Sequence, residues 1–187
     1  MKRLALTKSL CAICALAVLA ALLVVGAGSA SASSATGGAA FVPPPPPPKK
    51  AKIVNGKAIA PRNAPARVKR MIRAGNRIIG KPYVWGGGHA TFSKLDRGYD
   101  CSGTVSYALR GGRLIKSPMA SGGLMSWGRS GPGKWVTVYA HSGHAYMVVA
   151  GLRLDTSMRD DPSRTGPGWS KRLRRSDAFV ARHPRGL

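Results

Sequence analysis

Cys101 has the surroundings of a nucleophile. It stands in Asp100-Cys101-Ser102-Gly103, directly before a segment, Ser102–Arg110, that is predicted to be helical and to end at two glycines. A cysteine in the first turn of a helix lies near unpaired backbone N–H groups and the positive end of the helix dipole, which lower the thiol pKa. The same N–H groups can bind the oxyanion of a tetrahedral intermediate. We therefore predict a thiolate that attacks a carbonyl carbon.

A thiolate of this kind needs an imidazole to carry its proton and a polar group to orient the ring. The candidates are His89, His141, His144 and His183. His144 begins the strongest predicted strand, which forms a hairpin around Gly151 with the segment that carries Asp155. If the hairpin loop is even in length, Tyr146 faces Asp155, and His144 lies diagonal to Asp155 at roughly 7–8 Å. An odd loop would turn Asp155 to the other face. His141 is the rival base, and we expect it in the preceding turn.

The elements that must position these residues follow from periodicity. Apolar residues at helical spacing predict a helix over Pro65–Ile79. Alternation of apolar and polar residues predicts a strand over Trp135–Ala140 and a hairpin of His144–Ala150 with Leu152–Thr156. A glycine-rich loop, Pro82–Gly88, lies between the first helix and the cysteine. A helix that carries a cysteine, followed by an antiparallel sheet, defines an α+β fold.

Three motifs together resemble one family. Pro82-Tyr83-Val84-Trp85-Gly86-Gly87, then Asp100-Cys101-Ser102-Gly103 opening a helix, then Gly143-His144 opening a strand are similar to the NlpC/P60 cysteine peptidases. The resemblance covers residues 80–187. It implies a papain-like α+β fold and cleavage of peptide bonds in the stem peptides of bacterial peptidoglycan. The bond that it implies is the one between D-glutamate and the diamino acid.

The same resemblance assigns roles to residues. It implies Cys101 as the nucleophile and His144 as the base, with a third polar residue, here Asp155, that orients the imidazole. It also implies that Tyr83, Asp100 and Ser102 line the substrate groove. Two features depart from the family pattern. The third polar residue is more often His, Asn or Gln, and the strand begins His-Ala-Tyr-Met where a Val-Gly-Ile pattern is commoner.

The N-terminus has the features of an export signal. Lys2, Arg3 and Lys8 precede the uncharged apolar run Leu10–Ala27, and an Ala-x-Ala site follows at residues 30–32. We expect residues 1–32 to be a cleaved signal peptide. The alternative is an uncleaved membrane anchor, because roughly 18 apolar residues can span a bilayer. Cys11 and Cys14 leave with the signal, so Cys101 remains as a lone thiol in an oxidising compartment, where an inert buried thiol or an intermolecular bridge are the alternative interpretations.

Residues 33–60 are predicted to be a disordered linker. They are rich in Ala, Ser and Gly and contain six consecutive prolines, Pro43–Pro48. A polyproline run is an extended spacer of about 3.1 Å per residue, so it would reach roughly 19 Å. It is either a stalk or an unstructured tail. Residues 61–187 are then one catalytic domain of ordinary size.

The charge limits the partners. The chain has 30 Lys and Arg against 6 acidic residues, a net charge of +24. Such a field attracts anionic wall polymers or an anionic lipid surface. No motif for specific nucleic-acid binding is present. We expect a secreted or wall-associated monomer with peptidoglycan stem peptides as its partner.

Three alternatives to a cysteine hydrolase remain open from the sequence. The first is a non-catalytic, cationic wall-binding module on the same fold. The second is an acyltransferase with the same Cys–His chemistry. The third is a zinc site formed by His141, His144 and Asp155. We expect the cysteine mechanism, which needs no cofactor and no metal.

Overall fold

The computed structural model describes residues 50–157 and 165–187. Three helices are present in this part of the chain: α1 (Ala66–Ile78), α2 (Cys101–Gly111) and the short α3 (Ser121–Leu124). The strands are β1 (Lys52–Val54), β2 (Lys57–Ile59), β3 (Arg129–Ser130), β4 (Val136–His141), β5 (His144–Val149), β6 (Leu152–Ser157), β7 (Thr165–Ser170) and β8 (Val180–His183). Both expected long helices and the strands of the expected hairpin are confirmed to within two residues at each end.

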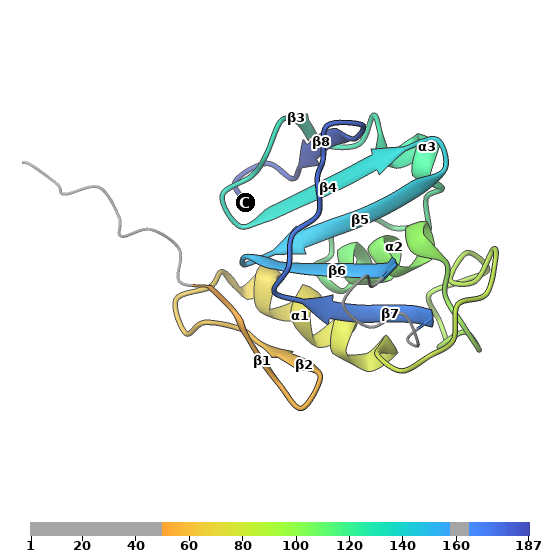
Figure 1. Cartoon of the computed structure of the whole chain (residues 1–187), viewed down its shortest axis with the longest axis horizontal. Helices are drawn as coiled ribbons and strands as arrows, with labels where there is room; N and C mark the ends of the chain where they lie inside the picture. Colours follow the sequence, from red (N-terminus) through yellow and green to blue (C-terminus); the bar gives the residue numbers. More distant parts are fainter. Residues whose placement is uncertain (1–49, 158–164) are drawn as a thin grey trace, which may run out of the picture. The chain divides into compact units, whose positions relative to one another are not determined.

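Six strands form one antiparallel sheet in the order β3-β8-β4-β5-β6-β7. Helices α1 and α2 lie against one face of this sheet (Figure 1). The chain leaves β7 at one edge and must pass β6, β5 and β4 to reach β8. The expected α+β class, with a cysteine at the start of a helix that packs on an antiparallel sheet, is therefore confirmed.

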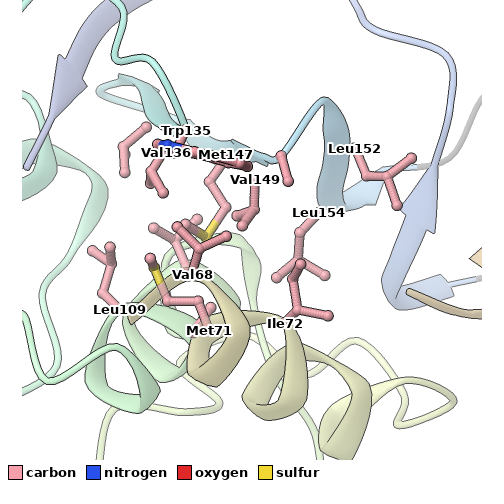
Figure 2. Packing of buried hydrophobic residues seen from close by; sticks show 14 of the residues in the cluster. Val68, Met71, Ile72, Leu109, Trp135, Val136, Met147, Val149, Leu152 and Leu154 are labelled. Carbon is pink, nitrogen blue, oxygen red and sulfur yellow. The ribbon is translucent and has the colours of Figure 1, made fainter. Parts of the chain in front are cut away.

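The core lies between the two helices and the sheet. Figure 2 shows Val68, Met71 and Ile72 of α1 facing side chains of the central strands. On β5, Met147 and Val149 are fully buried in this core. They share one face of the sheet because alternate residues of a strand point to the same side. His144 and Tyr146 therefore belong to the opposite face of the sheet, which the connection from β7 to β8 crosses.

The turn between β5 and β6 determines the register of the hairpin. Ala150 and Gly151 have φ angles of 48° and 79°. Two positive φ angles in a two-residue loop are typical of a type I′ turn. Val149 pairs with Leu152 and Met147 with Leu154. The even loop on which the placement of His144 beside Asp155 depended is thus confirmed.

The expected linker boundary is wrong for residues 50–60. Strands β1 and β2 form a hairpin there, with Asn55-Gly56 at its tip. The backbone N–H and C=O of Ala58 bond to the side chain of Asn76 in α1, both at 2.9 Å. Ala58 is buried in the core, so the ordered domain begins before residue 61. The expected signal peptide at residues 1–32 and the proline run lie outside the described residues.

No helix within residues 50–157 and 165–187 has the length and apolar character needed to cross a membrane.

Candidate active site

Cys101 is the first residue of α2, and Asp100 caps that helix. Asp100 Oδ1 accepts a hydrogen bond from the N–H of Gly103 at 2.6 Å, and its backbone oxygen accepts one from the N–H of Thr104 at 3.0 Å. An aspartate in this position satisfies N–H groups that the helix itself leaves unpaired. The thiol of Cys101 is free, and the residue is 8% exposed. The cysteine is therefore held at the positive end of a well-capped helix.

The glycine-rich loop fixes Asp100 from its other side. Asp100 Oδ2 accepts from the N–H of Gly86 at 3.1 Å, and the Asp100 N–H donates to the carbonyl of Gly87. This carbonyl lies so close to Gly103 that a Cβ there would collide with it. The missing side chain of Gly103 thus lets the loop approach the start of the helix.

His144 and Asp155 meet as the even register predicted. His144 Nε2 lies 2.9 Å from Asp155 Oδ1, and the Asp155 side chain is fully buried. Asp155 Oδ1 also accepts from the N–H groups of Thr156 and Ser157, at 2.8 and 3.1 Å. With Nε2 held by this carboxylate, Nδ1 is the ring nitrogen left to interact with the Cys101 thiol.

The thiol and the imidazole shift each other's acidity. Burial alone would lower the pKa of His144, but hydrogen bonds to Asp155 and Cys101 and the charges of both raise it to about 9. Burial would raise the pKa of Cys101, yet hydrogen bonds from the His144 side chain and the Ala145 N–H, with the charge of His144, lower it below the ordinary value. These opposite shifts favour a thiolate–imidazolium pair.

Arg174 is a site residue that sequence reasoning missed. It lies in the segment between β7 and β8, and its Nη1 donates to Asp155 Oδ2 at 3.1 Å. Its guanidinium also lies over the rings of Tyr146 and Phe179, at 5.4 and 5.3 Å from their centroids. No local pattern marks it, because it reaches Asp155 only when the chain crosses the sheet.

His89, one of the four candidate bases, has contacts that the sequence did not predict. Its Nε2 lies 3.0 Å from Asp100 Oδ1 and 3.1 Å from Ser102 Oγ. Two of the residues expected to line the substrate groove, Asp100 and Ser102, are thus joined by an imidazole. The third, Tyr83, lies near Cys101 and Asp100. Burial, followed by the charges of these two residues, raises the pKa of its phenol. Trp85, in the same loop, is 85% exposed.

His141 does not contact the thiol. It is the last residue of β4, its Nδ1 accepts from the N–H of Gly143 at 3.0 Å, and its ring packs on Phe179. Its ring centroid lies 6.4 Å from that of His144. Within the described residues, no three His, Cys, Asp or Glu side chains are grouped so that they could hold a metal ion.

Comparison with solved structures finds similar folds, two of which are NlpC/P60 proteins. No family model and no curated protein sequence matches the chain. An NlpC/P60 family protein from Bacillus cereus aligns with a TM-score of 0.45 and 19% identity over 64% of this chain, which spans 40% of that protein's length. RipD from Mycobacterium tuberculosis, described as a non-catalytic NlpC/p60 domain protein adapted to peptidoglycan binding, aligns with a TM-score of 0.46 and 18% identity over 64% of this chain and 98% of that one.

Proposed function

We propose that this chain is a cysteine hydrolase that cleaves peptide bonds in the stem peptides of peptidoglycan. The observation that carries the chemistry is the arrangement of three side chains: a buried thiol at a helix start, hydrogen-bonded to an imidazole that a buried carboxylate holds at 2.9 Å. A binding module has no need of a shifted thiol. The substrate class rests on the three sequence motifs around Tyr83, Cys101 and His144.

The geometry supports the following steps. The Cys101 thiolate attacks the carbonyl carbon of the scissile bond. The N–H groups of Cys101 and Ser102, at the free end of α2, can donate to the oxyanion. The His144 imidazolium gives its Nδ1 proton to the leaving amine, and the C–N bond breaks to leave a thioester. Neutral His144 then takes a proton from water, which attacks the thioester and restores the thiolate.

Asp155 keeps the ring of His144 in the orientation that these steps need. A buried carboxylate on Nε2 fixes the tautomer of the neutral ring and stabilises the imidazolium. In the peptidases that this chain resembles, His, Asn or Gln more often has this role. The fully buried carboxylate of Asp155 can also perform it.

Tyr83, Asp100 and Ser102 are the proposed substrate contacts. They lie on the glycine-rich loop and at the start of α2, beside the thiol. The proposed bond is the one between D-glutamate and the diamino acid. The enzyme would act outside the membrane, with residues 1–32 as its export signal.

The test compares the chain from Ser33 onward with its Cys101→Ala variant. Both are incubated with muropeptides that contain a diamino acid, and the products are identified by mass spectrometry. The proposal expects cleavage by the first and at least about 10³-fold slower cleavage by the second, because the nucleophile is lost. Ser117→Ala, at an exposed position beyond the same helix, is the control and should retain activity.

Other results would contradict the proposal. Equal cleavage by both chains would exclude a Cys101 mechanism. Wall binding without products from either would indicate a binding module. Products joined to an added amine, in place of hydrolysed ones, would indicate an acyltransferase.

A further inference from the structure

Three hollows join into one cationic furrow on the described surface. The first, of about 430 Å³, is lined by Ile53, Trp169, Ser170, Lys171 and Arg172. The second, of about 420 Å³, shares Arg172 with it and continues over Arg153, Leu173, Arg174 and Arg175. The third, of about 430 Å³, shares Ile53 and Lys171 with the first and is further lined by Lys50, Ala51, Lys52, Val54, Gly151 and Leu152. Because they share lining residues, the three hollows lie side by side.

Every charged residue that lines this cationic furrow is positive. Three of these cations have acidic partners: Asp155 contacts Arg153 and Arg174, and Asp177 contacts Arg175. The other four, Lys50, Lys52, Lys171 and Arg172, have no ion pair with any described residue. Among the described residues, the cations without an acidic partner therefore line the first and third hollows, where their fields add.

The walls of the furrow are fixed to the fold. Ala51 N–H donates to the carbonyl of Ala150 at 2.8 Å, which ties the start of the β1–β2 hairpin to the β5–β6 turn. On the other wall, the Arg172 N–H donates to Ser170 Oγ at 3.0 Å. The floor includes Trp169, which is 5% exposed and bonded through Nε1 to Asn76. The cations are thus carried by an ordered backbone.

We propose that the cationic furrow binds a linear polymer whose repeating units carry phosphate groups. A row of Lys and Arg along an elongated hollow can neutralise successive charges of an extended strand, and both residue types bind phosphate. A flat membrane surface would contact a protruding basic face better than a concave one. The second hollow includes Arg174, which bonds to Asp155, but the cations without an acidic partner line the other two hollows. The proposal therefore holds whether or not Cys101 is a nucleophile.

The test measures the binding of fluorescently labelled inorganic polyphosphate over a series of salt concentrations. The furrow variant carries Lys52→Gln, Lys171→Gln and Arg172→Gln. The matched control carries Arg67→Gln, Arg73→Gln and Arg77→Gln, three exposed cations of α1 that lower the net charge equally. Both are made in the chain from Ser33 onward, and circular dichroism checks their folding.

The furrow variant should bind polyphosphate at least about tenfold more weakly than the parent, and its log–log salt slope should fall by about two to three. The control should change affinity by less than about threefold. Equal weakening in both variants would overturn the proposal in favour of general charge attraction. Equal binding of polyglutamate would overturn the phosphate assignment, and stronger binding to phosphatidylglycerol vesicles would indicate a lipid surface instead.

Discussion

At the scale of single residues, the site is a chain of charges that alternate in sign. The Cys101 thiolate, the His144 imidazolium, the Asp155 carboxylate and the Arg174 guanidinium follow one another through hydrogen bonds. A buried carboxylate is costly unless it is well bonded, and Asp155 has two backbone N–H donors besides its charged neighbours. The fold can therefore keep an ionised carboxylate beside the imidazole.

Arg174 is expected to act as a positioning residue for this carboxylate. In Arg174→Gln, kcat should fall about tenfold with little change in KM, because Asp155 Oδ2 loses its hydrogen bond from the Arg174 guanidinium. A positive charge 3.1 Å from Asp155 is also lost, so the pKa of His144 should rise. The alkaline limb of the pH–rate profile, near 9 in the parent, should move upward.

The readout for Arg174 is the pH dependence of kcat/KM. Arg175→Gln is the matched control, because Arg175 is exposed and bonds to Asp177 instead. An unmoved alkaline limb in Arg174→Gln would assign Arg174 a structural role only.

At the scale of elements, Asn76 joins three segments that are far apart in the sequence. Its side chain bonds to both backbone groups of Ala58 in β2, and its Oδ1 also accepts from Trp169 Nε1 in β7 at 2.9 Å. This one residue of α1 thus holds the β1–β2 hairpin and the sheet edge together.

Asn76→Ala should lower the free energy of unfolding by about 2–4 kcal/mol, because it leaves three partly buried groups without their partner. Urea denaturation measures this change. Asn63→Ala, at an exposed position, should change it by less than about 0.5 kcal/mol. Equal effects of the two substitutions would mean that the hairpin is not held through Asn76.

At the scale of the whole molecule, the thiol–imidazole pair makes stability depend on pH in a characteristic way. The pKa of His144 is raised on folding, so its contribution is present below the unfolded pKa and lost as pH rises through about 9. The pKa of Cys101 is lowered, so its contribution is present above the unfolded pKa and lost as pH falls. At a pH where the folded pair is thiolate and imidazolium and the unfolded pair is thiol and neutral imidazole, each pair holds one proton. Stability then does not change with pH through this pair.

The parent chain should therefore show little pH dependence of stability from this pair up to about pH 9. The lower limit of this range is about pH 6.5, the unfolded pKa of His144, or the lowered pKa of Cys101 if that is higher. In Cys101→Ala only the His144 contribution remains, still raised by Asp155. Its free energy of unfolding should fall with pH above about 6.5, by up to about 1.4 kcal/mol per unit. Urea denaturation at a series of pH values checks this. The same slope in Cys101→Ala and in its double variant with His144→Ala would contradict the assignment.

Local features of the sequence determined the elements and the position of the thiol. Helical spacing of apolar residues defined α1, and Asp100 and the glycines at residues 111 and 112 marked both ends of the helix that begins at Cys101. Alternation of apolar and polar residues predicted β4, β5 and β6, whereas the even loop that places His144 beside Asp155 was a condition that the structure met. The Asn55-Gly56 turn was an equally local signal for the β1–β2 hairpin, which the composition of the preceding linker obscured.

Only the tertiary structure decided which distant residues meet. Cys101 and His144 come together because the start of α2 lies beside the start of β5, where the backbone of Ala145 also bonds to the thiol. His89 joins Asp100 and Ser102 because the glycine-rich loop folds over the start of that helix. Arg174 reaches Asp155 because β8 pairs with β4, so the chain must cross the sheet. Capping and periodicity depend on neighbours a few residues away, whereas strand order and packing depend on the whole core, which no local pattern encodes.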